Sequence, residues 1–195
     1  EGLLYTLIHD KLGDYYEVSG IGTCKDENIA IPEVYNDLPV KTIGKEAFED
    51  CKDLLSITIP GSIVTFGLNA FLYCDNLAKV NFTGTIDQWA EIDFEYDLNV
   101  MEGLYSNPLI YARCLYINNE LVTEIELTSA QKVSDIAFLI CNSLTSVILS
   151  DNVDSLGIAA FGYCGSLTRV IGGNNVTSIG DSAFYDCSSL TTITI

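Results

Sequence analysis

Residues 47–74 read AFEDCKDLLSITIPGSIVTFGLNAFLYC. This stretch begins and ends with the phrase Ala-Phe-x-x-Cys, which occurs five times in the chain and recurs every 23 residues wherever neighbouring copies are intact. The cysteines of the five copies are Cys51, Cys74, Cys141, Cys164 and Cys187. A fixed period of this length is typical of a solenoid, in which each unit is too small to bury its own apolar face and therefore stacks on the next.

Apolar residues recur at fixed positions after each repeat cysteine. Counting the cysteine as position 1, position 4 is leucine, and positions 7 and 9 are apolar in every copy except for Gly172 at position 9. Position 7 holds Ile57, Val80, Val147, Val170 and Ile193. Apolar residues that alternate with polar ones indicate a half-buried strand. We therefore predict a β-rich repeat solenoid with one short parallel strand in each repeat of about 23 residues.

The second half of each repeat has its own pattern. Positions 13 and 16 are apolar, and position 17 holds Gly44, Gly67, Gly157 and Gly180. Glycine at a fixed position is expected where the backbone adopts an unusual dihedral angle or turns a tight corner. The phenylalanine of each Ala-Phe pair is expected to stack on its counterpart in the next repeat. We interpret all these apolar positions as core rather than as a binding site.

The centre of the chain departs from the pattern. Cys74 and Cys141 are 67 residues apart, which is close to three repeats with two residues missing. The register predicts a degenerate central repeat that buries Trp89 and Phe94, and it places Asn119 in the cysteine position. Apolar positions also fall on Ile86, Val122, Ile125, Leu127 and Val133. An irregular insertion is expected at about 95–114, and Asn118-Asn119 is expected to form a tight turn between two strands.

The two ends of the chain differ. Residues 3–8 and 15–19 read as two strands of an N-terminal hairpin cap over residues 1–23, followed by the repeat array over 24–195. Ile195 stops in mid-strand, so we expect the chain to be truncated or to continue into further repeats. The exposed edge of residues 191–195 predicts end-to-end self-association.

Seven cysteines raise the question of disulfides or a metal site. Five of them share one repeat position, so they should stack in a column at the strand spacing of roughly 4.8 Å. A disulfide needs closer β-carbons, and zinc favours paired ligands such as C-x-x-C, which the chain does not contain. We predict buried free thiols. Cys24 and Cys114 lie outside the column; they could pair or react, although burial is the favoured interpretation.

These motifs resemble those of a known family. The pattern Cys-x-x-Leu-x-x-Ile-x-Ile-Pro at residues 51–60, with Ala-Phe-x-x-Cys, resembles the BspA-like leucine-rich repeats of bacterial cell-surface proteins over nearly the whole chain. Residues 38–44 and 106–109 also look like recurring phrases of that family. The resemblance implies a leucine-rich-repeat-like solenoid in an extracellular, often cell-wall-associated protein. It also implies relatives that adhere to host matrix proteins or to other bacteria.

Composition and charge exclude several functions. The chain has 9 basic and 27 acidic residues and a net charge of -18, which disfavours nucleic acid and anionic membrane surfaces as partners. It contains no apolar run long enough for membrane insertion, and no export signal begins at Glu1. With His9 as the single histidine, we predict no catalytic residues, no metal site and no cofactor. A catalytic cysteine-histidine pair would require His9 to meet Cys24 or Cys114.

The strand positions that alternate with the core face outward and are the candidate binding surface. Serine and threonine there could equally serve only as strand formers. The predicted function is a non-catalytic extracellular binding or adhesion module for a protein or glycan, with a structural spacer in a larger cell-wall-associated protein as the alternative. The candidate ligand-binding residues are Ser56, Thr58, Lys79, Asn81, Glu124, Glu126, Ser146, Arg169, Thr192 and Thr194.

Overall fold

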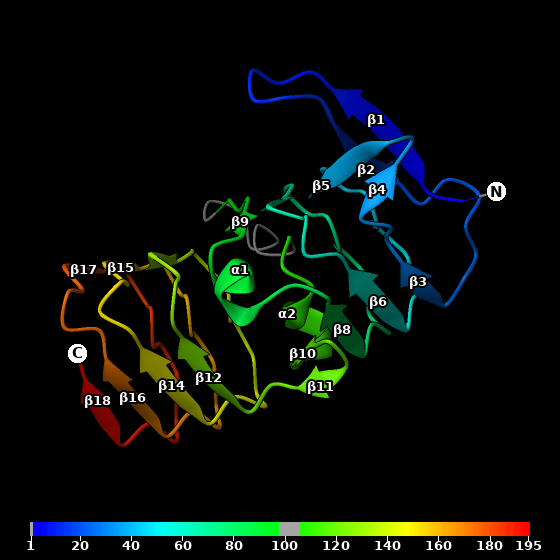
Figure 1. The fold of residues 1–195 in the computed structure, drawn as a ribbon. Helices are drawn as coiled ribbons and strands as arrows, with labels where there is room; N and C mark the ends of the chain where they lie inside the picture. Colours follow the sequence, from blue (N-terminus) through cyan, green and yellow to red (C-terminus); the bar gives the residue numbers. More distant parts are fainter. Residues whose placement is uncertain (1, 98–105) are drawn as a thin grey trace.

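The computed structural model describes residues 2–97 and 106–195 and shows a solenoid of stacked turns (Figure 1). Each turn contributes a short strand whose apolar side chains point into a continuous core. The strands on this front face are β3 (Asn28–Ala30), β6 (Ser56–Ile59), β8 (Lys79–Phe82), β10 (Leu115–Ile117), β12 (Glu124–Leu127), β14 (Ser146–Leu149), β16 (Arg169–Gly172) and β18 (Thr192–Thr194). The predicted solenoid with one short parallel strand per repeat is confirmed.

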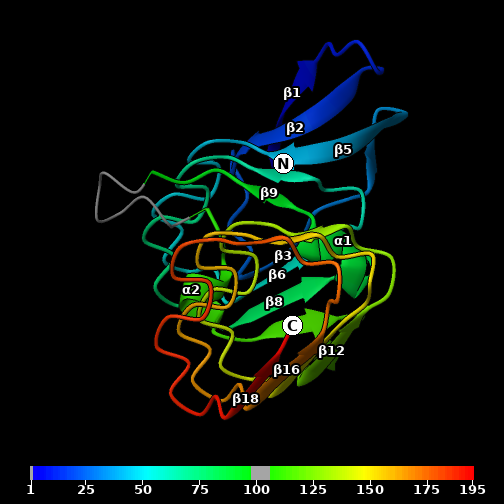
Figure 2. The ribbon, with the colours of Figure 1, turned by 90° about the vertical axis from the view of Figure 1, so that its left-hand side faces the viewer.

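A second set of strands closes the back of the core. Apart from one strand of six residues, these strands have two residues each, and they include the apolar residue of position 16, such as Phe66 and Leu156. They are β5 (Leu38–Ile43), β7 (Thr65–Phe66), β9 (Asp93–Phe94), β13 (Lys132–Val133), β15 (Ser155–Leu156) and β17 (Ser178–Ile179). Figure 2 views the turns from the C-terminal side and shows the front and back strands on opposite sides of the stack.

The N-terminal hairpin joins the back strands. Its strands β1 (Leu4–Ile8) and β2 (Tyr15–Gly20) pair antiparallel, and β2 then pairs parallel with β5. A further short strand, β4 (Val34–Tyr35), pairs antiparallel with β5. The two hairpin strands lie where the sequence predicts them. That they cap the array, and that the array begins at residue 24, stay predictions.

Aromatic rings stack from one turn to the next. The rings of Phe48 and Phe71 lie 5.2 Å apart between centroids at an interplanar angle of 7°. Phe161 stacks in the same way between Phe138 and Phe184, at 5.3 Å and 5.5 Å. The predicted stacking of the Ala-Phe rings is confirmed.

The five repeat cysteines are buried free thiols, as predicted. The thiol of Cys74 donates a hydrogen bond of 3.0 Å to the carbonyl oxygen of Phe48 in the preceding turn. Cys164 and Cys187 make the equivalent bonds of 3.1 Å to Phe138 and Phe161. Burial raises the pKa of the Cys141 thiol to about 11. These thiols therefore act as packed core groups that also satisfy a backbone carbonyl.

Cys24 and Cys114 differ from the repeat cysteines, because each is only partly buried. The expectation of simple burial is therefore wrong for both. The Cys24 thiol donates to the carboxylate of Asp26 at 3.6 Å, and the Cys114 thiol donates to the carbonyl oxygen of Ala112 at 3.2 Å. Both thiols are thus satisfied locally, near the surface.

The repeat glycines allow the turns to approach each other. A β-carbon on Gly157 would lie 2.6 Å from the carbonyl carbon of Ser134, and one on Gly67 would lie 2.7 Å from that of Gly44. Neither glycine has a positive φ, so the expectation of an unusual dihedral angle is wrong. Glycine is needed here because the backbone of the preceding turn occupies the space of a side chain.

The left-handed backbone conformation occurs elsewhere in the repeat. It is adopted by the residue before each Ala-Phe and by the residue before each repeat cysteine. These residues are Glu46, Asn69, Ile136, Ala159 and Ser182 in the first position and Asp50, Tyr73, Ile140, Tyr163 and Asp186 in the second. Every intact repeat therefore carries two non-glycine residues with positive φ, a conformation that costs roughly 1–2 kcal/mol each.

A short helix replaces part of the repeat in the centre. Helix α1 (Ile86–Ala90) begins with a capping box in which Thr85 and Gln88 exchange hydrogen bonds. Trp89 and Phe94 are buried, which confirms their prediction as core residues. The indole Nε1 of Trp89 donates to the carbonyl oxygen of Ala137 at 2.9 Å.

The expected irregular insertion at about 95–114 includes residues 98–105, which lie outside the described residues. Its described end contains helix α2 (Leu109–Ala112), which follows the fully buried Asn107. The side-chain amide of Asn107 donates to the carbonyl oxygens of Ile136 and Ala137, at 2.7 Å and 3.2 Å. The described end of the insertion is thereby attached to the turn that contains Ile136 and Ala137.

The predicted tight turn at Asn118-Asn119 is present. It joins β10 to the antiparallel strand β11 (Glu120–Leu121), and both asparagines have positive φ, 50° and 71°. Asn119 is exposed in this turn, so its predicted place in the cysteine column is wrong. The next strand nevertheless keeps the repeat register, because Ile125 and Leu127 pair with Val147 and Leu149.

Candidate binding surface

The front face consists of two separate sheets. The N-terminal front sheet has the order β11-β10-β8-β6-β3, and the C-terminal front sheet has the order β12-β14-β16-β18. The break occurs because β11 folds back on β10 and occupies the edge at which β12 would otherwise pair. The candidate residues therefore form two groups rather than one continuous ribbon.

In the N-terminal front sheet, Ser56 and Thr58 lie in register with Lys79 and Asn81 of the next strand. The hydroxyl of Ser56 donates to the side-chain oxygen of Asn28 at 2.6 Å. Ser56, Thr58 and Lys79 are partly exposed. These three side chains are available to a ligand.

Asn81 is buried, with an exposed fraction of 3%. Its side-chain oxygen accepts the backbone N–H of Asn119 at 2.6 Å, so the β10–β11 turn covers it. The ammonium of Lys79 lies 4.8 Å from the ring centroid of Tyr116 and 3.3 Å from the side-chain oxygen of Asn119. Asn81 is therefore a structural anchor for the turn, and its assignment to the ligand-binding surface is wrong.

In the C-terminal front sheet, one row of aligned residues runs Glu124, Ser146, Arg169 and Thr192. The Nε of Arg169 donates to the hydroxyl of Ser146 at 2.8 Å, and Ser146 is 3% exposed. Because the arginine covers it, Ser146 is also wrong as a ligand-contacting residue. Glu124, Arg169 and Thr192 are exposed.

A second row of the same sheet runs Glu126, Ile148, Ile171 and Thr194. Glu126 and Thr194 are exposed, and the two isoleucines between them are half-buried. This sheet thus presents an apolar centre with charged residues at one edge and threonines at the other.

A groove at the break between the two front sheets was not foreseen from the sequence. It has a volume of about 520 Å³, and its lining includes Ile86 of α1, Ile117 of β10 and Ile125 of β12. Glu124 and Glu126 of the candidate set also line it. The Thr85–Gln88 capping pair and the Asn118-Asn119 turn are the sequence signals that could have revealed the elements around this groove.

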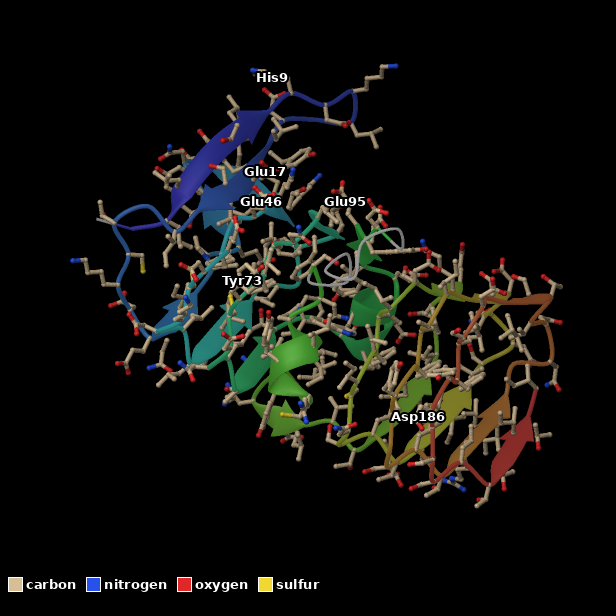
Figure 3. The ribbon with its side chains drawn as sticks, turned by 180° about the vertical axis from the view of Figure 1, so that it is seen from behind. His9, Glu17, Glu46, Tyr73, Glu95 and Asp186 are labelled. Carbon is tan, nitrogen blue, oxygen red and sulfur yellow. The ribbon has the colours of Figure 1, made fainter. Side chains whose placement is uncertain are left out.

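Among the described residues, His9 pairs with an aspartate rather than with Cys24 or Cys114. His9 lies at the tip of the N-terminal hairpin (Figure 3), where its Nδ1 is 3.0 Å from the carboxylate of Asp14. Within residues 2–97 and 106–195, no group of three or more histidine, cysteine or acidic residues is arranged to hold a metal ion. The helices in that part of the chain are also too short to span a membrane.

Acidic groups near the hairpin interact with each other. Glu17, which is labelled with Glu46 and Glu95 in Figure 3, lies against Gly44, where a β-carbon would be 2.7 Å from its carboxyl carbon. Burial, and next the charge of Glu95, raise the pKa of Glu17. The carboxylate of Glu95 accepts the backbone N–H of Leu68 at 3.1 Å. These groups join adjacent turns.

Comparison with known proteins places this architecture in a family. The model of the BspA type leucine rich repeat region matches residues 22–106 and 109–195, in six copies. The chain belongs to the BspA-type leucine-rich repeat family. Proteins of leucine-rich repeat families are generally non-catalytic, and membership in this family suggests a protein-binding or structural module. Among curated proteins, none matches the chain significantly.

Solved structures agree with the BspA-type fold. A leucine rich cell surface protein from Faecalibacterium prausnitzii is 25% identical with a TM-score of 0.58; the match covers 97% of this chain and 52% of that one. A leucine-rich repeat protein from Bacteroides ovatus is 24% identical with a TM-score of 0.56; the match covers 99% of this chain and 51% of that one. The chain spans about half the length of these two structures.

Proposed function

We propose that this BspA-type chain is a non-catalytic extracellular binding module that recognises a protein or glycan with the outward side chains of its two front sheets. The observation that carries the proposal is the alternation of core residues and outward-facing residues within each strand. Residues at the repeated positions, such as Ile57 and Val147, are fully buried, whereas most of those between them are exposed or partly exposed and differ from turn to turn. A rigid backbone therefore presents a variable set of polar and apolar side chains.

The relatives support the same proposal. One solved structure with this fold is described as a cell surface protein, and BspA-type repeats occupy nearly the whole of the present chain. The net charge of -18 favours a partner with basic groups, whose association would be accelerated by the acidic surface and slowed by salt. Adhesion would follow if the partner were a component of another cell or of a matrix.

The test is a binding screen of the purified chain against arrays of matrix proteins and glycans. The variants Thr58→Arg and Ile148→Arg each place a long charged side chain on one front sheet, and Val64→Arg is the matched control because Val64 is exposed away from both sheets. We expect one front-sheet variant to lose at least about tenfold in affinity for a captured partner while the control does not. Absence of any partner would favour the alternative role of a structural spacer.

A further inference from the structure

We infer that the groove between the two front sheets binds an extended peptide in which arginine or lysine alternates with branched apolar residues, and that the peptide pairs with the free edge of β12. This inference rests on the proposed binding function and names the site and the class of partner. Figure 1 shows β11 and β12 on either side of the break, with α1 beside it.

The first argument is the free backbone of β12. Thr145 donates its N–H to the carbonyl oxygen of Thr123, and Ser150 donates to that of Leu127, so alternate residues of β12 direct their backbone groups toward β14. Glu124 and Glu126 lie between these and direct their N–H and C=O groups to the opposite edge. That edge faces the groove, and within residues 2–97 and 106–195 β12 pairs with no strand besides β14. An unpaired strand edge of this kind is a template for an added strand.

The second argument is the apolar floor. Ile125 points inward from β12 and is 3% exposed, and Ile86 and Ile117 are partly buried beside it. Leu121 of β11 also lines the groove and is 46% exposed, which is high for a leucine in such a position. Side chains on one face of an added strand would cover these groups, and branched apolar residues fit such a surface.

The third argument is charge. Glu120, Glu124 and Glu126 line the groove, and none of its nine lining residues is basic. On the outward face of an added strand, side chains would lie directly beside those of Glu124 and Glu126 as cross-strand neighbours. Arginine satisfies such carboxylates best, because its guanidinium donates two parallel hydrogen bonds while its aliphatic stem covers apolar surface.

The groove also has a closed end, which limits the length of the added strand. The carboxylate of Asp87 in α1 accepts the backbone N–H groups of Thr128, Ser129 and Ala130, at 2.8–2.9 Å. The edge beyond Leu127 is therefore already occupied. The peptide has room for a strand of about four or five residues along β12, a usual strand length.

The experiment uses a fluorescent probe, the capped heptapeptide Thr-Arg-Val-Arg-Val-Arg-Thr, and measures its binding by anisotropy to the whole chain. Two control peptides carry the same charge: one has its arginines and valines in separate blocks, and one is N-methylated at the backbone of its arginines and valines, so that it cannot donate to a strand edge in either orientation. The block peptide loses the cross-strand pairing of its side chains, and the N-methylated peptide loses two backbone hydrogen bonds. We expect each to bind about tenfold more weakly than the probe.

Variants of the protein separate charge from strand pairing. E124Q/E126Q should weaken binding of the probe about tenfold, whereas E33Q/E49Q, which removes two exposed carboxylates elsewhere, should change it less than about twofold. Glu126→Pro removes a backbone N–H that points to the groove but breaks no hydrogen bond to β14. The Glu126→Pro variant should therefore bind the probe more weakly than the Glu126→Gln variant does. Thermal unfolding of each variant confirms that it is folded.

Amide hydrogen exchange gives a readout that does not depend on any variant. The N–H groups of Glu124 and Glu126 should become protected when the probe binds. Equal binding of all three peptides, unchanged binding by E124Q/E126Q, or unprotected amides in the complex would overturn the inference. If Thr58→Arg abolishes binding of a partner found in the screen and E124Q/E126Q does not, the proposed function stands and the inference about the groove is wrong.

Discussion

The close approach of adjacent turns makes Gly157→Ala the most informative single substitution. A β-carbon at this position would lie 2.6 Å from the carbonyl carbon of Ser134 and 2.5 Å from the side-chain oxygen of Asp135, and it would also meet the backbone nitrogen of Asp135. Ordinary contacts of this kind begin at 3.4 Å. The neighbouring turn would therefore have to move by about 1 Å to relieve the shortest of these contacts.

The cost follows from what that movement disturbs. Gly157 donates its N–H to the carbonyl oxygen of Val133 at 2.7 Å, and Ile158 donates to the carboxylate of Asp135 at 2.6 Å. Overpacking costs typically about 1–3 kcal/mol, and weakening one such hydrogen bond adds about 1 kcal/mol. We expect a loss of roughly 2–4 kcal/mol in the free energy of unfolding, or about 5–15 °C in the thermal midpoint.

The assay is thermal and denaturant unfolding monitored by the emission of Trp89, which is fully buried and is the single tryptophan of the chain. Gly165→Ala is the matched control, because a β-carbon there would have no neighbour closer than 3.9 Å and Gly165 has no positive φ. It should be neutral or stabilising by up to about 1 kcal/mol. Equal stability of the two variants would refute the role assigned to the repeat glycines.

Three further predictions concern single residues. Ala159→Gly should stabilise the chain by about 1 kcal/mol because Ala159 has φ 49°, whereas Ala160→Gly, at a fully buried position without positive φ, should destabilise it by a similar amount or more in urea unfolding. Burial by itself would raise the pKa of Asp87, but the hydrogen bonds that its carboxylate accepts from three backbone N–H groups and a hydroxyl lower the pKa overall. The carboxylate should therefore stabilise the fold above pH 3.8, the ordinary pKa, and this stabilisation should disappear as the pH falls through the lowered pKa of the folded state. Thermal midpoints between about pH 6 and pH 3 should accordingly fall less steeply for Asp87→Asn than for the unmodified chain, and equal slopes would contradict this. In mass-spectrometric alkylation at about pH 8, the partly exposed Cys24 should react in the native protein, whereas the buried Cys141 should react only after denaturation; fast native labelling of Cys141 would contradict its burial.

The repeat predicted most of the core because burial acts on residue type directly. Positions occupied by Ile57, Phe82 and Leu149 are apolar in every intact repeat except at Gly172, so their periodicity is visible in the sequence. The left-handed positions have no such signature. Ile136 and Ala159 occupy the same place in successive repeats, and the backbone there is determined by the hydrogen bonds between turns rather than by side-chain preference. Apolar periodicity therefore cannot reveal them.

The candidate surface was predicted less completely than the core. Alternation along a strand shows which side a residue faces, but not what covers it. Asn81 and Ser146 face outward and are buried, because Asn119 of the β10–β11 turn lies over the first and Arg169 of the adjacent strand lies over the second. The break between the front sheets likewise depends on where β11 pairs, which the apolar register alone does not determine. Long-range pairing thus accounts for the residues that the sequence placed wrongly.

The carbonyl oxygen of Ala137 accepts hydrogen bonds from both the indole of Trp89 and the amide of Asn107. These two donors lie 48 and 30 residues earlier in the chain, so this oxygen joins segments that are remote in the sequence. If the chain were pulled from one end, intact turns would separate from the stack one at a time. Extension through the centre would instead have to break the bonds at Ala137 and those at Asp87 together. We therefore expect the highest resistance to pulling in the middle of the stack, at the least regular part of its sequence.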